Sequence, residues 1–329
     1  MKKSLLALAV LGAFAGAASA QSSVTLYGII DANLGKSIGS SDKRMDQGAQ
    51  SRLGVRGVED LGGGLAAVFQ FEHRFDSGTG QQLGQLSTAA APGTNAFWQA
   101  RSYVGLQGGF GKILLGREYT QAFWQQLAAD PWGYDTVASS LTAGFAGGGV
   151  ANNRLNNAVT YSIAAAGFSF GAQIAEANTN GSSSVTTNAA KKPFNLAAAY
   201  DIGGLSVGVA YENPGDADDK WTVVRASYKF GAVKVGGLYG TGTQADTDKV
   251  KSYLLTVTAD VGAGQIRAAY GDRKIDPVGA VSSASDLKGF ALGYHHAVSK
   301  RTTLYVDYAN NSKAATEKNG YDFGVKHSF

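Results

Sequence analysis

The sequence predicts an all-β fold, a 16-stranded antiparallel transmembrane β-barrel with a long inward-folded third loop. Three observations lead to this prediction. Many short segments alternate apolar and polar residues, the connections between them are sorted by length, and residues 120–153 do not alternate at all. Because successive side chains of a strand point to opposite faces, alternation places one face in an apolar phase and the other in a wet one.

The alternating segments predict sixteen strands. In the first strand, Leu26 and Ile30 share one face, whereas Tyr27 and Asp31 share the other. The same pattern recurs to the end of the chain. The predicted strands cover residues 24–33, 51–59, 65–75, 100–107, 112–119, 156–163, 167–175, 193–200, 205–212, 221–230, 233–239, 253–260, 265–272, 290–296, 302–310 and 321–329.

The connections between these strands alternate strictly between short and long. An up-and-down antiparallel sheet puts alternate connections at opposite ends, so tight turns gather at one end and long loops at the other. This asymmetry is typical of outer-membrane barrels. The short, mostly Gly-rich connections are 60–64, 108–111, 164–166, 201–204, 231–232, 261–264 and 297–301. The long polar connections are 35–50, 76–97, 120–153, 176–192, 213–220, 240–250, 273–289 and 311–319.

A soluble β-sandwich is the main alternative fold, because its strands also alternate. A sandwich would not sort its loops so strictly by length, and its apolar faces would be rich in Val, Ile and Leu. Here the apolar faces carry aromatic residues near the strand ends, which is typical of membrane-interface girdles. Only a closed barrel removes open sheet edges from lipid, so the barrel is favoured. The aromatic residues are Tyr200, Tyr211, Tyr228, Phe230, Tyr239, Tyr253, Tyr270, Tyr294 and Tyr308.

Residues 1–20 are predicted to be a cleaved secretory signal peptide, which leaves 21–329 as one barrel domain. Lys2 and Lys3 precede an apolar run that is too short for a membrane anchor, and Ala18-Ser19-Ala20 fits a cleavage site. Removing the two lysines takes the formal net charge from +4 to +2, which argues against a nucleic-acid surface. The chain has no Cys, so it has neither a disulfide framework nor a thiolate metal site.

Residues 120–153 form the longest connection, and loops of this length are usually functional or disordered. Their aromatic residues Phe123, Trp124 and Trp132 indicate that part of the segment packs. We therefore expect this loop to fold into the barrel and to narrow a water-filled pore. Passive diffusion through such a pore needs no catalytic group and no cofactor.

Several segments resemble the general, non-specific porins of the beta-proteobacterial outer membrane. They are residues 21–32, 51–65, 115–120 (LGREYT), 130–133 (DPWG), 154–161 (RLNNAVTY) and the closing strand 321–329. The resemblance implies a homotrimer of barrels in the outer membrane, each with its own pore for small hydrophilic solutes. It also implies contact with lipopolysaccharide and outer-membrane lipid, and a terminal Phe329 that the barrel-assembly machinery reads.

Strand parity places a set of charged side chains in the lumen, namely Arg52, Arg56, Glu72, Arg74, Arg225, Lys234, Arg267 and Asp307. The resemblance implies that the pore constriction has a basic wall made of Arg52, Arg101, Arg117 and Arg154. The acids expected at the constriction are Asp130, Asp135 and Glu72. Together these groups suggest a mild preference for anions.

Arg117 departs from this parity, because strict alternation would place it on the apolar face with Ile113 and Leu115. An arginine in lipid costs about 2–4 kcal/mol near the midplane, so lumen placement is favoured. We expect a β-bulge before the loop to redirect this side chain.

Three other functions are alternatives to a general pore. A solute-specific porin would use an aromatic track, for which Tyr27, Tyr103 and Tyr305 are candidates. An adhesin would bind host surfaces through its long loops. A barrel hydrolase would need a Ser–His–acid set, and none can be assembled around the four His, so no enzyme is expected. Acidic loop residues are weak candidates for divalent ions that bridge lipopolysaccharide, because their spacing matches no calcium loop. These are Asp216, Asp218, Asp219, Asp246 and Asp248.

Overall fold

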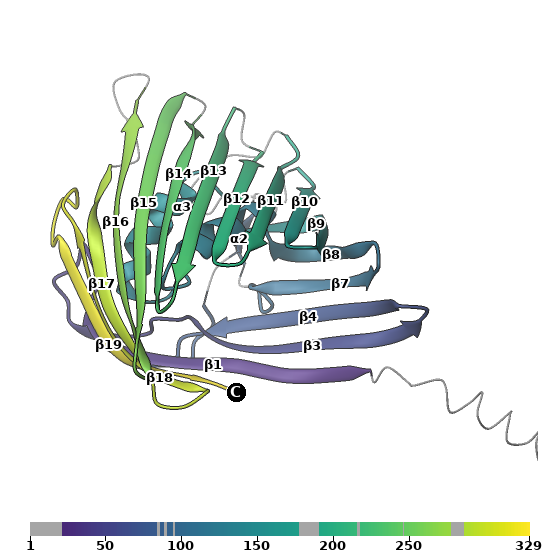
Figure 1. The fold of residues 1–329 in the computed structure, drawn as a ribbon, viewed down its shortest axis with the longest axis horizontal. Coiled ribbons are helices and arrows are strands. Elements are labelled where there is room, and N and C mark those ends of the chain that lie inside the picture. Colours follow the sequence, from purple (N-terminus) through teal and green to yellow (C-terminus); the bar gives the residue numbers. More distant parts are fainter. Residues whose placement is uncertain are drawn as a thin grey trace, which may run out of the picture.

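The computed structural model describes residues 22–83, 86–88, 91–94, 96–177, 191–215, 218–245, 247–277 and 286–329 (Figure 1). The predicted signal peptide and its cleavage site lie outside these residues, so the domain boundary stays a prediction. Asp216 and Asp246 of the acidic loop residues also lie outside them.

Sixteen long strands form the wall, as predicted. They are β1 (Ser23–Lys36), β3 (Ser51–Gly62), β4 (Leu65–Phe75), β7 (Arg101–Gly108), β8 (Gly111–Tyr119), β9 (Arg154–Ala165), β10 (Phe168–Ala175), β11 (Phe194–Ile202), β12 (Leu205–Asn213), β13 (Lys220–Phe230), β14 (Val233–Gln244), β15 (Asp248–Val261), β16 (Gly264–Asp276), β17 (Leu287–Ala297), β18 (Thr302–Asn311) and β19 (Asn319–Ser328). Three short strands lie in the long connections: β2 (Arg44–Asp46), β5 (Leu86–Thr88) and β6 (Ala91–Thr94).

The strands close into a barrel. Each long strand pairs antiparallel with the next, and β19 pairs with β1 from Ile29↔Ser328 to Lys36↔Tyr321. The described wall therefore has no open edge, which is the condition for a sheet in lipid. One predicted connection is shorter than expected, because β14 and β15 keep pairing as far as Gln244↔Asp248.

The two faces of the wall differ in the way that the alternation predicts. In β15, Leu254 is 0% exposed whereas its neighbour Leu255 is 58% exposed. The outward face also carries aromatic pairs at two levels. Phe168–Tyr200 and Tyr228–Phe230 lie near the short turns, and Tyr253–Tyr270 and Phe290–Tyr308 lie near the long loops. Two such levels match the aromatic girdles of a membrane barrel.

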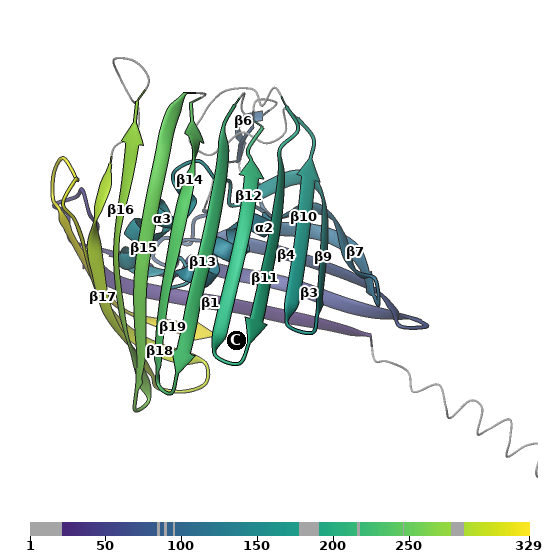
Figure 2. The ribbon, with the colours of Figure 1, turned by 45° about the horizontal axis from the view of Figure 1, so that its top comes forward.

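The short turns gather at one end of the barrel and the long loops at the other (Figure 2). The tightest turn, Gly231-Ala232 between β13 and β14, needs a positive φ of 60° at Gly231. Glycine adopts that conformation at little steric cost, whereas another residue would be strained. The predicted sorting of connections by length holds except between β14 and β15, where only residues 245–247 separate the two strands.

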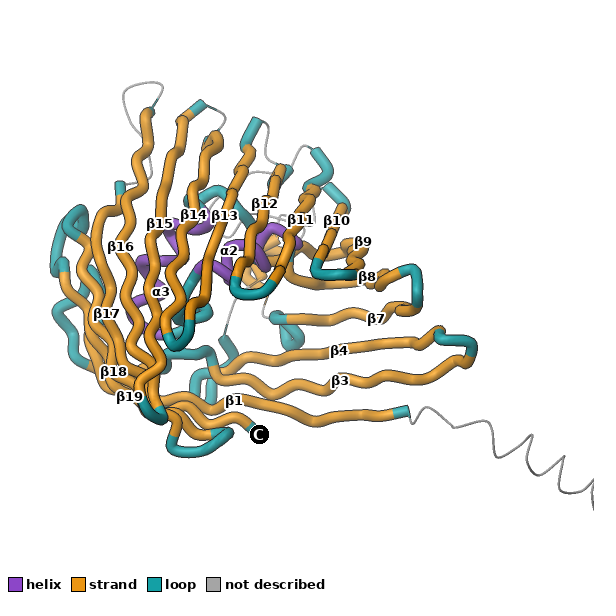
Figure 3. Tube along the Cα trace, viewed as in Figure 1, coloured by secondary structure: helices purple, strands orange, loops and turns teal. Residues whose placement is uncertain are grey.

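The connection between β8 and β9 contains two helices that the sequence pattern did not indicate, α2 (Gln121–Ala129) and α3 (Thr136–Gly147). Helix α2 contacts β10 to β14, and α3 contacts β14 to β19 (Figure 3). In the described chain, no helix has the length and apolar character needed to cross a membrane.

Helix α3 packs on the inward face of the wall through a dry apolar cluster. Leu141 and Phe145 of α3 are 2% and 0% exposed and lie in one cluster with Trp221, Val250 and Leu254 of the strands. Part of the barrel interior is thus an apolar core and not a wet surface. Of the loop's aromatic residues, Phe123 and Trp132 are buried at 5% and 2% exposure, whereas Trp124 is 36% exposed. The effect of the loop on the width of the pore stays a prediction.

Candidate pore constriction

Both ends of the 120–153 loop are fixed to the wall. Thr120 caps α2, since its Oγ1 accepts a hydrogen bond from the backbone N of Phe123 at 2.9 Å. The carboxylate of Glu212 on β12 accepts from Thr120 Oγ1 at 3.4 Å and from the backbone N of Asn152 at 2.6 Å. One buried acid therefore contacts the beginning and the end of the loop.

Asp130 organises the turn between α2 and α3. Its Oδ1 accepts hydrogen bonds from Trp132 N at 3.1 Å and Thr142 Oγ1 at 3.0 Å. Its Oδ2 accepts from Tyr134 N at 2.7 Å and Ser139 Oγ at 3.0 Å. Burial raises the pKa of the Asp130 carboxyl, and these four donors lower it part of the way back. The Asp130 carboxylate is 7% exposed, its hydrogen bonds stay within the loop, and it borders a small cavity together with Arg225 and Lys234.

The tip of the loop is anchored on the strands across the barrel. Trp132 Nε1 donates to Asp307 Oδ1 on β18 at 2.6 Å, and His295 Nε2 lies 2.9 Å from Asp307 Oδ2. Asp135 forms an ion pair with Lys326 on β19 at 2.9 Å. The loop is thus held at its base by β12 and at its tip by β18 and β19.

A cavity of about 530 Å³ separates this loop from the wall formed by β3, β4, β7 and the start of β9. It opens toward the long connections, because Asp46 and Asp76 also line it. The residues that matter for its chemistry are Arg52, Glu72, Arg74, Arg101, Tyr119 and Arg154 on the wall side, and Phe123, Trp124, Tyr134 and Asp135 on the loop side.

Tyr119 is the centre of the arginine cluster, and sequence reasoning did not single it out. The Arg154 guanidinium lies 4.1 Å from the centroid of the Tyr119 ring and also donates to its hydroxyl. Arg74 Nη2 donates to the same hydroxyl at 2.6 Å, and the Arg101 guanidinium lies 5.5 Å from the ring centroid. One ring therefore positions three cations that would otherwise repel one another.

The ion pairs leave part of this positive charge without a counter-charge. Arg101 binds Glu118 through two of its nitrogens, at 2.5 to 3.1 Å, and Arg74 lies 3.3 Å from Glu72. Arg52 donates to the backbone oxygen of Gln50 at 3.0 Å. In the described part of the chain, neither Arg52 nor Arg154 has a carboxylate within salt-bridge distance. Glu72 lies on the same wall as the arginines and not opposite them.

Arg117 does not line this cavity. Its Nε donates to the backbone oxygen of Gln99 at 2.6 Å, and its Nη1 donates to Asn156 Oδ1 at 2.5 Å. The expected bulge exists, but the extra residue is on β9, where Asn157 has a φ of 47°. Arg117 therefore still pairs with Ser102, while its neighbour Glu118 takes the place beside Arg101.

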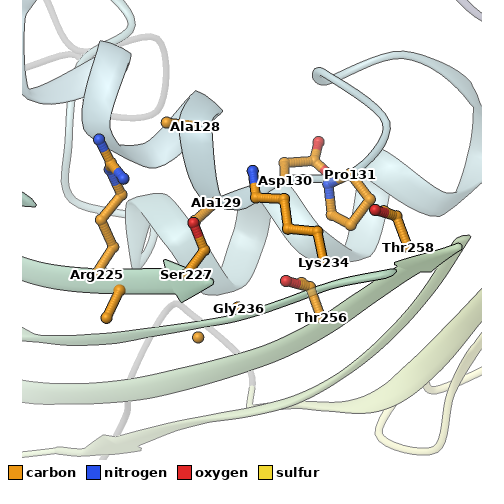
Figure 4. Close-up of a pocket in the computed structure, with 12 residues that line it drawn as sticks. Ala128, Ala129, Asp130, Pro131, Arg225, Ser227, Lys234, Gly236, Thr256 and Thr258 are labelled. Atoms are coloured by element: carbon orange, nitrogen blue, oxygen red, sulfur yellow. The ribbon is translucent and has the colours of Figure 1, made fainter. Parts of the chain in front are cut away.

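Two further cavities lie along the loop. One of about 790 Å³ opens toward the short turns, with Gly64 and Gly109 in its lining. The other, of about 40 Å³, lies between Pro131 and the wall residues Arg225 and Lys234 (Figure 4). The inward placement of these two basic residues agrees with strand parity.

Comparison with known proteins assigns the family. The profile of the Gram-negative porin family matches residues 7–316. The chain belongs to this family. The porin is 34% identical over 377 residues to outer membrane porin protein 32 of Delftia acidovorans, an alignment that covers 100% of both chains. It is 29% identical over 402 residues, again with full coverage, to an outer membrane porin protein of Bordetella pertussis.

Solved structures agree with this assignment. The anion-selective porin from Comamonas acidovorans superposes with a TM-score of 0.73 and 27% identity, covering 94% of this porin and 100% of that chain. A loop-deletion variant of OmpT from Vibrio cholerae reaches a TM-score of 0.71 at 14% identity, over 94% of this porin and 99% of that chain, which shows the shared fold. The protein is an outer-membrane channel with a multi-pass β-barrel.

Proposed function

We propose that this porin is a general diffusion channel for small hydrophilic solutes and ions, with a mild preference for anions. The observation that carries the proposal is the arginine cluster around Tyr119, on the wall that faces the loop. Its ion pairs compensate Arg74 and Arg101, whereas Arg52 and Arg154 keep their charge without a carboxylate partner in the described chain. A partly compensated cluster favours anions only mildly, because the carboxylates beside Arg74 and Arg101 cancel about half of its positive charge.

The loop is proposed to be the constriction, with residues 120–153 narrowing the water-filled pore. Its anchors on β12, β18 and β19 and the cavities on either side of it support this role. We propose that Arg52, Arg74, Arg101 and Arg154 form the basic side, because all four line the cavity. Arg117, which we expected in this set, does not line it. The acidic side retains Asp135 and loses Asp130.

A reversal potential in a KCl gradient tests the anion preference on the purified protein in planar bilayers. We expect a small potential of the anion-selective sign. Arg52→Gln and Arg154→Gln should each move it toward cations, whereas Arg301→Gln in an exposed turn should not. A cation-selective wild type, or arginine variants that match the Arg301→Gln control, would overturn the proposal. Ohmic current that sugars do not block would separate a general pore from a solute-specific one.

The assembly is proposed from the resemblance to general porins. The mature chain starts at Gln21, forms a homotrimer, and reaches the outer membrane through the barrel-assembly machinery, which reads Phe329. Its long loops and outer face contact lipopolysaccharide and lipid. OmpT of Vibrio cholerae, which shares the fold, is described in a trimer form. Intact mass of the exported protein checks the start, and cross-linking in membranes checks the trimer. No catalytic activity is part of this proposal.

A further inference from the structure

Trp124 occupies an unusual position on α2. The side chains around it on the helix are buried, including Phe123 at 5% exposure and Gln126 at 1%. Trp124 is 36% exposed, although it is the largest side chain of the helix. Since α2 contacts β10 to β14 on their inward side, an exposed indole here faces the space inside the barrel and not lipid.

The indole borders both large cavities. The cavity of about 530 Å³ opens toward the long loops and the cavity of about 790 Å³ opens toward the short turns. In the described part of the chain, Trp124 is the one residue that the two linings have in common. A solute that passes from one cavity to the other therefore passes this ring.

The ring is held in place. Its centroid lies 5.1 Å from that of Tyr119 and 5.9 Å from that of Phe123. The Arg101 guanidinium lies 5.6 Å from the ring, on the side of the arginine cluster. Helix α2 itself is fixed by the Thr120 cap at its beginning, and at its end the backbone N of Asp130 donates to the Leu127 oxygen at 3.1 Å. These contacts favour one orientation of the indole, which makes it a rigid partition.

We infer that Trp124 is a specificity-determining residue of this pore, because its indole separates the two cavities and sets the size of the solutes that pass. The inference rests on the proposed role of the loop as the constriction. It concerns width and not charge. The contacts of Arg101 with Glu118 and of Arg154 with the Tyr119 ring do not involve the indole. We therefore expect the charge preference to be unchanged when the indole is removed.

Trp124→Ala in planar bilayers tests the inference, with Trp98→Ala as the matched control. Trp98 is 38% exposed and packs on Phe71, on the outward face. Trp124→Ala should raise the single-channel conductance by at least about 1.5-fold, since conductance follows pore diameter. It should also admit larger sugars in liposome-swelling assays, while the sign of the reversal potential stays unchanged. Conductance equal to that of Trp98→Ala would overturn the inference.

Trp124→Cys gives a second test that does not depend on a truncated side chain. The native chain has no Cys, so the new thiol is unique. We expect a bulky methanethiosulfonate reagent added from either side to lower the raised current, and a reductant to restore it. The same label on Trp98→Cys should leave the current unchanged. A labelled Trp124→Cys channel with unchanged current would contradict the inference.

The outcomes separate this inference from the proposed function. If Arg52→Gln shifts the reversal potential but the Trp124 variants match their controls, the proposed function stands and the partition does not. If both sets of variants match their controls, the loop and the arginine wall do not form the constriction, and both proposals fail.

Discussion

Gly28 and Phe329 join the first and the last strand of the barrel. The backbone N of Phe329 donates to the Gly28 oxygen at 3.1 Å, and the Gly28 N donates to the Phe329 oxygen at 3.0 Å. The Phe329 ring covers Gly28 so closely that a Cβ on Gly28 would overlap the ring atom Cζ. The terminal residue that we expect the assembly machinery to read thus also extends the closing pair of strands.

Gly28→Leu should therefore weaken closure of the barrel. The added side chain must displace the Phe329 ring, and overpacking of this kind costs about 1–3 kcal/mol. We expect less folded protein in the outer membrane and a lower temperature for the shift of the heat-modifiable band on gels. Gly109→Ala is the control, because a Cβ there meets nothing within 4 Å. Equal folded yields for the two variants would contradict the argument.

Asp130→Ala should loosen the 120–153 loop without removing a charge from the cavity that the arginines line. Four donors would lose this acceptor, although Thr142 Oγ1 keeps the Ala138 oxygen at 3.4 Å, and each buried donor left unsatisfied costs about 1–3 kcal/mol. We expect noisier open-channel current and an unchanged sign of the reversal potential. An open-channel current without added noise, together with a shifted reversal potential, would instead show that the Asp130 charge acts on ions in the pore.

Trp132→Phe should release the tip of the loop from the strands. The variant keeps the aromatic ring but loses the Nε1 donor to Asp307, and a hydrogen bond to a charged group contributes about 1.5–3 kcal/mol. We expect closure at a lower applied voltage than in the wild type. Trp98→Phe removes the same group from a ring on the outward face and should behave as the wild type. If the two variants close at the same voltage, Trp132 is not an anchor.

The barrel was predictable because lipid and water impose a period of two along every strand. Leu254 and Leu255 differ completely in exposure, and only their parity distinguishes them. The loop lacked such a signal. Its helices pack against a mixed interior, so residues around most of α2 are buried and no apolar stripe with a helical period stands out.

The differences between the expected and the observed surroundings of the site residues also have a local cause. Asp130 has the residue type of a pore-lining acid, but Ser139 and Thr142 reach it only because α3 folds back. We expected the bulge on the strand of Arg117, which is β8, but the extra residue belongs to β9. The sequence of β8 therefore could not indicate it. Glu118 could have been found by parity, since it is the neighbour that faces Arg101 across the strands.

Glu118→Gln should strengthen the preference for anions, in the direction opposite to Arg52→Gln. Glu118 is 2% exposed and its carboxylate binds Arg101 at 2.5 to 3.1 Å, so it cancels much of that charge beside the pore. The amide retains a hydrogen-bond acceptor for the guanidinium but carries no charge. The reversal potential in a KCl gradient should therefore become more anion-selective. Glu317→Gln is the control, because Glu317 pairs with Lys36 in a long connection away from the cavity. A reversal potential that moves toward cations would contradict this prediction. It would show that Glu118 affects selectivity mainly by holding Arg101 in position and not by offsetting its charge.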